Sequence, residues 1–445
     1  MLARFRFAER SRRAAVLGAL AALAACTAAR SDERPVITIS GSALGTEGTL
    51  LRRQVARFMA AHPDIVVRVQ PTPDDATQRH QLFVQWLNAH VGDPDVLQLD
   101  VVWTPEFAAA GWILPLDRFR PSRASFFPAT IEANEWAGKL YALPWFADVG
   151  LLYWRTDLVD HEPRSLDDLV TLAQRAMARP NGPPYGIVWQ GARYEGLVTV
   201  FQEYLGAFGG RITTDDGRVV VDSPEGVRAL TFMLDEITRF HIAPPDVLTW
   251  HEEEARFAFQ NGTAVFMRNW PYAYALLADS SASRVAGKFA VTAMPAAPGG
   301  HPTATLGGAQ LAINAYSEHP EAAYALIAYL TAPEQMLERA RAVGEYPTRP
   351  SLYHDPRLAA SVPAPLAQIE RAIERATPRP VIPIYTQLSE ILQIQLHRAL
   401  TGQAPPAAAL HTAAREMNDL IARTRIRELM ARGAGSGADT TGGAR

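Results

Sequence analysis

Carboxylate side chains follow several segments of this chain that have the composition of β-strands, and ligands bind at such strand ends in open α/β sheets. Glu47 lies after the first of these segments, Asp100 stands near the end of residues 97–102, and Asp148 follows residues 143–147. Each has a structural alternative: Glu47 at a helix N-terminus, Asp100 bonded to backbone amides, and Asp148 in a hinge or turn. These residues alone leave both interpretations open.

A second group of side chains that could bind a ligand lies in residues 262–276. There an apolar tract is followed by Arg268, Asn269, Trp270, Pro271, Tyr272 and Tyr274. A sugar has apolar C–H faces and a rim of hydroxyl groups, so its site needs flat aromatic rings beside carboxylate, amide and guanidinium groups. Trp270 would supply a stacking surface, Tyr272 a ring with a polar tip, and Arg268 and Asn269 hydrogen-bond donors. The alternative is that the aromatic residues begin a buried helix.

Common catalytic and metal-binding patterns are absent from the sequence. There is no HExxH, GxSxG or GxxxxGK[ST] motif, and the eleven histidines lack metal-ligand spacing. The run 252–254 is three glutamates, which we interpret as the acidic first turn of a helix. The glycine pairs at 209–210 and 307–308 indicate turns or close backbone approaches. We therefore expect no enzyme activity, no metal site and no cofactor.

The order of strand-like and helix-like segments predicts an α/β protein. Strands are expected at 36–39, 65–69, 97–102, 185–189, 263–267 and 289–294, and helices at about 49–62, 77–90, 165–178, 224–240 and 320–330. Alternation of this kind favours parallel sheets covered by helices on both faces. A chain of 445 residues exceeds what one hydrophobic core usually supports, so two lobes are expected.

The first 25 residues resemble a secretory signal peptide, with five arginines before an apolar run too short to span a bilayer comfortably. The segment Leu23-Ala24-Ala25-Cys26 resembles a bacterial lipobox, whose cysteine becomes the diacylated first residue of the exported protein; the alternative is a buried thiol. Cys26 is the only cysteine, which excludes an internal disulfide. We expect residues 26–35 to be a tether and 433–445 a flexible tail.

Net charge narrows the range of partners. Removal of the signal peptide takes away five arginines and one glutamate, which shifts the formal charge from −3 to −7. This acidity argues against nucleic acid as a partner and against adsorption on anionic lipid. Because no second hydrophobic span follows, we expect the lipid to be the only attachment to a membrane.

Six stretches spread over nearly the whole exported chain resemble the extracellular solute-binding proteins of ABC sugar importers, most closely the trehalose/maltose-binding branch. They are PDVLQLDVVWTPEFAAAGWILPLD (94–117), GKLYALPWFADVGLLYWR (138–155), GIVWQGARYEGLV (186–198), FQNGTAVFMRNWPYAY (259–274), ATLGGAQLAI (304–313) and PRPVIPIYTQLSEI (378–391).

The resemblance implies a two-lobe periplasmic-binding-protein fold, class II-like, in which each lobe is a mostly parallel sheet flanked by helices and several strands form the hinge. It assigns residues 36–146 and about 296–349 to an N-lobe, and about 147–295 and 350–432 to a C-lobe. The ligand would lie between the lobes, and closure around it would be the signal that the permease reads.

Position by position, the resemblance implies ligand contacts at Glu47, Arg79, Asp100, Phe146, Asp148, Trp270, Tyr272, Gly308, Ala309 and Arg379. Glu47, Arg79 and Asp100 would hold the sugar from one lobe. Trp270 and Tyr272 would stack on its ring from the other, while Arg379 and Asp148 would lock the closed state.

Two positions depart from the pattern of that branch. Phe146 stands where the relatives carry tyrosine, which loses a hydroxyl group and keeps a ring face. Ala309 stands where they carry tryptophan after two glycines. The small side chain removes a stacking surface and opens room for a different or longer ligand.

These observations predict a monomeric, lipid-anchored substrate-binding protein that delivers an α-linked glucose disaccharide, maltose or trehalose, to ABC permease subunits. One alternative is a binding protein for another oligosaccharide or for a non-sugar solute such as a phosphodiester or polyamine. The other is a secreted glycosidase, which would need two carboxylates about 5–10 Å apart across the scissile bond.

Overall fold

The computed structural model describes residues 34–42, 46–214, 216–360 and 366–424. The predicted signal peptide, Cys26, most of the tether and the tail at 433–445 lie outside the described residues. In the described part, none of the helices combines the length and the apolar character that crossing a membrane requires.

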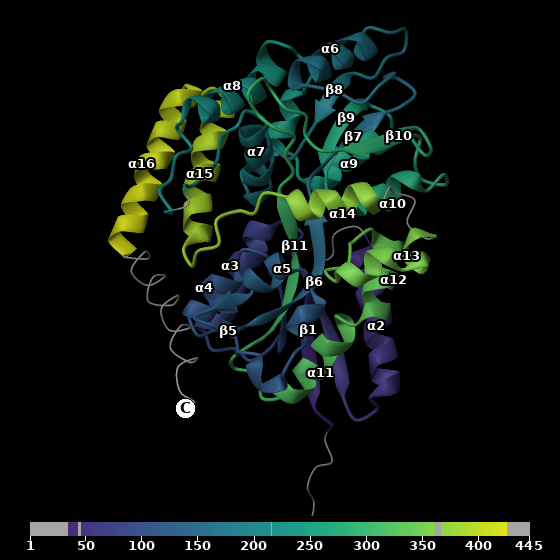
Figure 1. Ribbon diagram of the computed structural model, residues 1–445, viewed down its shortest axis with the longest axis vertical. Helices are drawn as coiled ribbons and strands as arrows, with labels where there is room; N and C mark the ends of the chain where they lie inside the picture. The colour runs from purple at the N-terminus through teal and green to yellow at the C-terminus, as the bar shows by residue number, and fades with distance from the viewer. Residues whose placement is uncertain (1–33, 43–45, 215, 361–365, 425–445) are drawn as a thin grey trace, which may run out of the picture.

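Two β-sheets, one in each half of the molecule, organise the chain (Figure 1). The N-lobe sheet has the order β2-β1-β3-β11-β6, with β1 (Val36–Ser42), β2 (Val66–Thr72), β3 (Val96–Asp100), β6 (Ala142–Val149) and β11 (Leu306–Ile313). The C-lobe sheet has the order β10-β7-β9-β8, with β7 (Leu151–Arg155), β8 (Tyr185–Val188), β9 (Ala264–Asn269) and β10 (Phe289–Thr292). A small ribbon joins β4 (Glu135–Trp136) and β5 (Lys139–Leu140).

In each large sheet, all strands but one run in the same direction. β1 pairs in parallel with β2 and β3, whereas β11 is antiparallel to both β3 and β6. In the C-lobe, β8 and β9 are parallel, and β7 is the reversed strand between β10 and β9. The predicted fold class, two α/β lobes with mostly parallel sheets, is confirmed.

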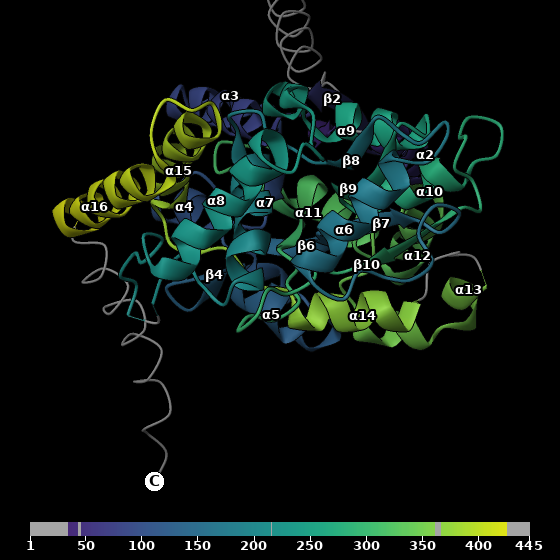
Figure 2. The same cartoon turned by 90° about the horizontal axis from the view of Figure 1, so that it is seen from above.

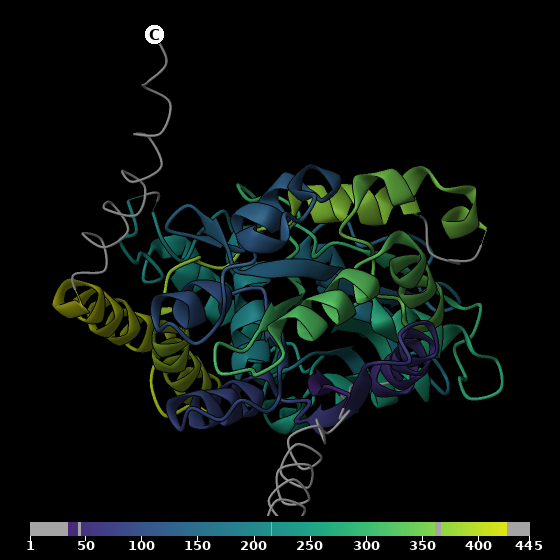
Figure 3. The same cartoon turned by 90° about the horizontal axis from the view of Figure 1, so that it is seen from below.

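The N-lobe helices cover a sheet that begins with β1, α2 and β2, which correspond to the first strand, helix and second strand expected from the sequence. Ile37 and Ile39 of β1 are fully buried, and Leu51, Val55 and Phe58 of α2 belong to the same core. α2 begins at Glu47 rather than at Thr49. The N-lobe helices are α2 (Glu47–Ala61), α3 (Ala76–Asn88), α4 (Thr104–Ala109), η1 (Asp117–Phe119), η2 (Arg123–Ser125), α5 (Pro128–Glu132), α11 (Pro320–Leu330), α12 (Pro333–Val343), η4 (Pro350–His354) and α13 (Pro356–Ala359). Seen from below, the green α11 and α12 lie beside the purple α2 (Figure 3).

Two of the C-lobe helices, α6 and α8, begin where a serine side chain caps the first turn. The Ser165 hydroxyl accepts a hydrogen bond from the backbone N–H of Asp168 in α6, and Ser223 does the same for Gly226 in α8, where Pro224 occupies the first turn. The C-lobe helices are α6 (Leu166–Met177), α7 (Glu195–Ala207), α8 (Pro224–Thr238), η3 (Pro245–Thr249), α9 (Glu252–Gln260) and α10 (Tyr272–Ala278).

Three C-terminal helices complete the structure: α14 (Leu366–Arg375), α15 (Tyr385–Leu400) and α16 (Pro406–Thr424). α14 lies across the junction of the two lobes (Figure 1). α15 packs on α7 and α8, and α16 packs on α15 and α8, so that this pair forms one edge of the molecule when it is seen from above (Figure 2).

The chain crosses between the sheets at Gly150, which separates β6 from β7, and again between β10 and β11. The backbone N–H of Gly150 donates to the carbonyl of Thr305 (3.1 Å), which joins the two crossings. A Cβ on Gly150 would lie 1.8 Å from Oε1 of Glu203, so only glycine fits there. Residues 147–149, assigned to the C-lobe from the sequence, still pair with β11 in the N-lobe sheet. Likewise η4 and α13 lie with α12 in the N-lobe, whereas the sequence-based boundary placed them in the C-lobe.

Candidate functional site

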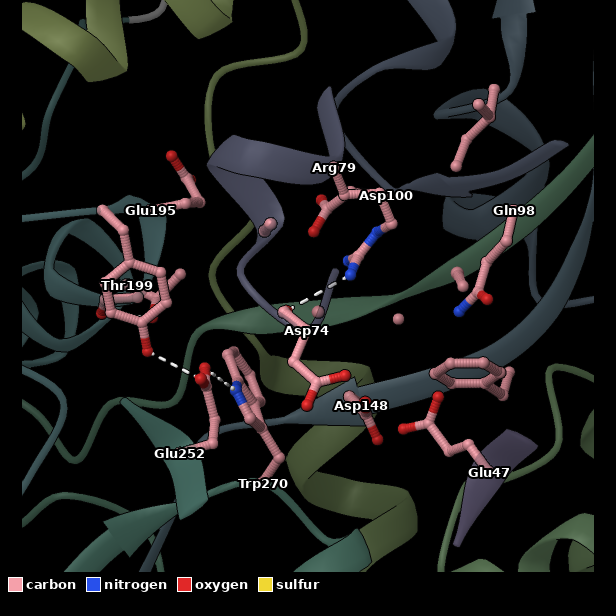
Figure 4. A pocket seen from close by; sticks show the side chains of 18 of the residues that line it. Glu47, Asp74, Arg79, Gln98, Asp100, Asp148, Glu195, Thr199, Glu252 and Trp270 are labelled. Carbon is pink, nitrogen blue, oxygen red and sulfur yellow. Dashed lines mark hydrogen bonds between the residues drawn. The ribbon is translucent and has the colours of Figure 1, made fainter. Parts of the chain in front are cut away.

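A cleft between the two lobes collects almost all of the predicted ligand-binding residues (Figure 4). It contains about 720 Å³ of space free of protein atoms, a value that includes its opening to solvent. Its polar and aromatic side chains are Glu47, Asp74, Arg79, Gln98, Asp100, Phe146, Asp148, Tyr194, Glu195, Thr199, Glu252, Trp270 and Arg379, and its backbone wall includes Gly307, Gly308 and Ala309. Of the predicted contacts, only Tyr272 is missing from this wall.

Arg379 joins the two lobes inside the cleft. Its Nη2 donates to Oδ1 of Asp100 (2.8 Å), at the carboxyl end of β3 in the N-lobe. Its Nη1 donates to Oε1 of Glu195 (2.7 Å), at the first residue of α7 in the C-lobe. The guanidinium is buried, with 2% of its side chain exposed, and the two carboxylates raise its pKa further above an already high value although burial opposes this. Arg379 is therefore a charged link between the lobes.

The position of Arg379 is fixed by its neighbours in both sequence and space. The N–H of Thr377 donates to the carbonyl of Ala304, and the N–H of Leu306 donates to the carbonyl of Thr377, so this segment is attached to the second crossing. Glu195 in turn accepts hydrogen bonds from the hydroxyl groups of Tyr385 (2.7 Å) and Ser389. The link thus lies where the crossing strands, α7 and α15 meet.

Trp270, the residue that follows β9, is held on three sides. Its indole Nε1 donates to Oε1 of Glu252 (3.3 Å), whose Oε2 accepts from the hydroxyl of Tyr194 (2.7 Å). The guanidinium carbon of Arg268 lies 4.0 Å from the centre of the indole ring. Gly307 approaches the ring edge. One ring face is therefore occupied by a cation, and the other is the surface that a ligand could stack on.

Arg268 and Asn269 do not reach the cleft as donors, which corrects the sequence-based interpretation. Arg268 is fully buried and forms a multiply hydrogen-bonded ion pair with Glu203, its Nε and Nη2 donating at 2.5–3.2 Å. Asn269 is fully buried and donates to the carbonyl of Glu252 (3.0 Å). Both residues support Trp270 from behind.

Tyr272 lies away from the cleft. It is the first residue of α10, only 4% of it is exposed, and its hydroxyl donates to Oε1 of Glu253 (2.7 Å) in α9. Two residues after Trp270, the chain has already turned into a helix, so the two rings no longer share a face. The sequence-based alternative, that the aromatic run begins a buried helix, describes Tyr272 correctly.

Glu47 and Asp148 point toward each other at one end of the cleft (Figure 4). Burial, and then the nearby carboxyl of Glu47, raise the pKa of Asp148 to about 8. Burial and repulsion from Glu345 raise the pKa of Glu47 well above its usual range. Oδ1 of Asp148 is shielded from water and has no hydrogen-bond partner among the described residues. Burial at this end of the cleft therefore favours the protonated form of Asp148.

The backbone of β11 forms the wall beside these carboxyl groups. Gly308 has a φ of 122°, and a Cβ there would lie 2.4 Å from the carbonyl oxygen of Phe146, so the position requires glycine. Ala309 pairs with Asp100 on one side and with Phe146 on the other, and a bulge follows it. The Phe146 ring contacts Trp145 at 5.5 Å between centres.

Arg79 projects from α3 into the same cleft. Its Nη1 donates to the carbonyls of Pro73 (2.8 Å) and Asp74 (3.2 Å), and its guanidinium lies 5.6 Å from the centre of the Trp103 ring. Its Nε is buried without a hydrogen-bond partner in the part of the chain that is described. A polar ligand atom could satisfy this donor.

Further contacts close the mouth of the cleft. Nε2 of His251, which precedes α9, lies 3.3 Å from Oδ2 of Asp75, which caps α3 in the other lobe. The hydrogen bond to Asp75 raises the pKa of His251. The N–H of Glu195 also donates to the hydroxyl of Thr77 (3.2 Å). The described state is one in which the lobes touch.

Glu195 and Glu252 line the cleft but were not identified from the sequence. Glu195 lies in the loop-to-helix segment after β8, so the strand-end rule that indicated Asp100 could have indicated it too. Glu252 does begin the acidic first turn of α9, as predicted, and it also faces the cleft.

The charge and shape of the cleft limit what it can hold. Six carboxyl groups and two guanidinium groups line it, so an anionic ligand is disfavoured and a ligand rich in hydroxyl donors is favoured. Within the described ranges, no three His, Cys, Asp or Glu side chains converge closely enough to hold a metal ion. The protein therefore has a polar cleft between two lobes and one indole surface in its wall. This arrangement defines a two-lobe binding protein.

The comparisons with known proteins agree with this class. Residues 42–337 match the family model of the bacterial extracellular solute-binding proteins, and the chain belongs to that family. A probable ABC transporter-binding protein of Deinococcus radiodurans is 36% identical over 413 residues, which cover 90% of this chain and 96% of the relative.

Solved structures show the same architecture. Maltose-bound MalE3 of T. maritima is 43% identical, with a TM-score of 0.83 over 86% of this chain and 99% of that chain. A solute-binding protein of Thermotoga lettingae with bound α-D-tagatose is 26% identical, with a TM-score of 0.79 over 87% of this chain and 100% of that chain.

Removal of Glu203 is expected to destabilise the protein strongly. Glu203→Ala leaves the buried guanidinium of Arg268 without its partner, which should cost about 3–5 kcal/mol in the free energy of unfolding. Glu334→Ala removes an exposed partner of Arg357 and should change that free energy by less than about 1 kcal/mol. Urea unfolding followed by circular dichroism measures both, and equal effects would contradict a special role for the buried pair.

A methyl group at Gly307 is expected to displace Trp270. Its Cβ would lie 3.0 Å and 3.2 Å from two indole carbons and 3.3 Å from Cβ of Asp148. In protein labelled with fluorotryptophan, Gly307→Ala should shift the ¹⁹F resonance of Trp270, assigned by its loss in Trp270→Phe, and leave that of the distant Trp112 in place. An unchanged Trp270 resonance would show that the ring has room that the structure does not provide.

Proposed function

We propose that this chain is the lipid-anchored, monomeric substrate-binding protein of an ABC importer. It captures an α-linked glucose disaccharide, maltose or trehalose, between its lobes and delivers it to permease subunits in the membrane. The observation that carries the proposal is the cleft in which carboxyl groups from both lobes face one indole surface.

The chemistry of the cleft supports a neutral ligand with many hydroxyl groups. Sugar hydroxyls can donate to carboxylates such as Asp100 and Glu195 and accept from the guanidinium groups of Arg79 and Arg379. The apolar C–H face of a sugar ring can cover the open face of Trp270. The excess of carboxyl groups disfavours a phosphodiester, and the indole surface favours a sugar over a bare polyamine.

Similarity to a solved structure supports maltose among the candidate sugars. The MalE3 structure from T. maritima holds maltose, and it combines the higher identity with the higher TM-score of the two solved structures compared above. The small side chain of Ala309 favours a second candidate, a longer or differently shaped oligosaccharide, because alanine takes up less of the cleft wall beside β3 than a tryptophan would.

We infer that the protein binds its ligand between the lobes without changing it chemically. A ligand shifts the protein toward the closed state only by the difference between its affinities for the closed and open states. Arg379 bridges Asp100 of the N-lobe and Glu195 of the C-lobe, so a sugar hydrogen-bonded to these groups binds the closed state more tightly. The closed shape is then what the permease recognises.

Calorimetric titration of the chain from Thr27 onward tests the proposal. Maltose, trehalose, sucrose and maltotriose are added in turn, and each mixture is checked afterwards for hydrolysis. We expect micromolar or tighter binding of an α-glucoside without turnover. Hydrolysis would indicate a glycosidase, and no binding to any of the four sugars would discard the α-glucoside assignment while leaving the family unchanged.

Trp270→Ala is expected to weaken sugar binding by about 1.5–3 kcal/mol, because the mutation removes the apolar area that stacks on the ring. Tyr272→Phe is the matched control. It removes a hydroxyl that bonds to Glu253 outside the cleft, so the dissociation constant should stay within about threefold of the wild-type value. Affinities that respond equally to both changes would contradict the placement of Trp270 and Tyr272.

A further inference from the structure

A polar contact spans the mouth of the cleft, outside the wall that a ligand would meet. Nε2 of His251, the residue before α9 in the C-lobe, lies 3.3 Å from Oδ2 of Asp75, the residue before α3 in the N-lobe. Neither residue lines the cleft, and their side chains are 38% and 14% exposed. The pair can therefore influence a ligand through the position of the lobes rather than by direct contact.

Helix N-termini hold both partners in place. Oδ1 of Asp75 accepts a hydrogen bond from the backbone N–H of Gln78 (2.9 Å) and caps α3, while Oδ2 faces His251. The backbone N–H of His251 donates to Oε2 of Glu254 in the first turn of α9 (2.9 Å). The His251 ring also contacts the ring of Tyr194, with the centres 4.4 Å apart. Because each partner is fixed to a helix of its own lobe, the contact exists only when the lobes are close together.

His251 lies among acidic side chains from both lobes. Asp75 faces it from α3, and Glu252 and Glu254 face it from α9. The Tyr194 ring, before α7, adds no charge, because burial raises the pKa of its hydroxyl well above the usual range. Separation of the lobes removes Asp75 and leaves the two glutamates, which follow His251 in the C-lobe. The attraction that depends on closure is therefore the contact with Asp75.

We propose that His251 and Asp75 are positioning residues for ligand capture: they hold the lobes together while His251 is protonated, so that sugar affinity is higher in mildly acidic than in alkaline solution. This inference rests on the proposed function, since the pair closes the cleft in which the sugar would bind. A protonated imidazole donates a charge-assisted hydrogen bond to the carboxylate, whereas a neutral ring can make only an ordinary one. The stronger bond raises the population of the closed state, and the apparent affinity rises with that population.

The direction of the pH effect follows from the two ionisations. The hydrogen bond to Asp75 raises the pKa of His251 and, against the effect of burial, lowers the pKa of Asp75. The contribution to closure is thus fully present below the ordinary pKa of histidine and is lost as the pH rises through the raised value. Asp148, whose pKa burial raises to about 8, titrates in the same range. The test therefore compares pH slopes among variants that all keep Asp148.

Calorimetric titration with maltose between pH 5.5 and 8.5 tests the proposal in the wild type, His251→Asn and His251→Lys. Asparagine can begin α9 without a charge, and lysine is charged throughout this range. At pH 5.5 we expect His251→Asn to bind about threefold more weakly than the wild type and His251→Lys to match the wild type. At pH 8.5 the wild type should bind as His251→Asn does, while His251→Lys stays about threefold tighter. Equal pH slopes in the three proteins would overturn the proposal.

His161 provides the matched control. Its Nδ1 lies 2.7 Å from Oδ1 of Asp160 and its Nε2 lies 3.2 Å from Oδ2 of Asp168, so both partners belong to the C-lobe. Its side chain is 31% exposed, close to the value for His251, and it does not line the cleft. His161→Asn should keep the wild-type affinity and pH slope. A slope changed as much as in His251→Asn would show that the effect does not come from a contact between the lobes.

The pair can also be observed without any ligand. In protein labelled with ¹³C at the histidine ring carbons, the His251 signal, assigned by its loss in His251→Asn, reports the pKa of this ring. Asp75→Asn keeps a residue that can cap α3, and it should lower that pKa by about 0.5, the change that corresponds to a threefold effect on affinity. An unchanged pKa would overturn the proposal. Failure of all sugars to bind would instead refute the proposed function and leave this readout valid.

Discussion

The contact of Arg379 with Asp100 and Glu195 is the interaction on which the cleft depends. A buried guanidinium is costly to remove from water, and here two carboxylates, one from each lobe, offset that cost. The same segment is bonded to the crossing strands through Thr377, so the charged link and the hinge form one unit. Any motion that separates the lobes must break at least one of these ion pairs.

Contacts between the lobes therefore stabilise the closed state even without a ligand. His251 and Asp75 touch across the mouth of the cleft, and Thr386 in the first turn of α15 donates to Glu106 of α4 (2.7 Å). A ligand must add interactions to the closed state beyond these contacts, and the Nε atoms of Arg79 and Arg379, which have no hydrogen-bond partner among the described residues, are positions where it can do so. Trp270, fixed between Arg268, Glu252 and Gly307, supplies a surface that needs little reordering.

Sequence patterns identified most of the fold because its strands and helices carry strong local signals. The strand-end rule also led to Asp100 and Asp148, which lie at the carboxyl ends of β3 and β6. The prediction that Arg268 donates to a sugar, made from the residue types around it, failed because alternate residues of β9 point to opposite faces and this one points toward Glu203. The prediction for Tyr272 failed because the chain enters α10 after Pro271. The partner of Arg379 in the C-lobe, Glu195, is 184 residues away, and no local pattern reports a pair at that separation.

The central claim is that ligand capture is closure held by Arg379, and the distance between the lobes tests it most directly. Spin labels on cysteines at Gln78 in α3 and Arg193 before α7, both exposed and on opposite lobes near the mouth of the cleft, would report it in the chain from Thr27 onward. With saturating maltose, the distance distribution should become shorter and narrower, and in Arg379→Met it should remain long. Distributions that are identical with and without sugar, or closure by Arg379→Met as complete as that of the wild type, would contradict the account.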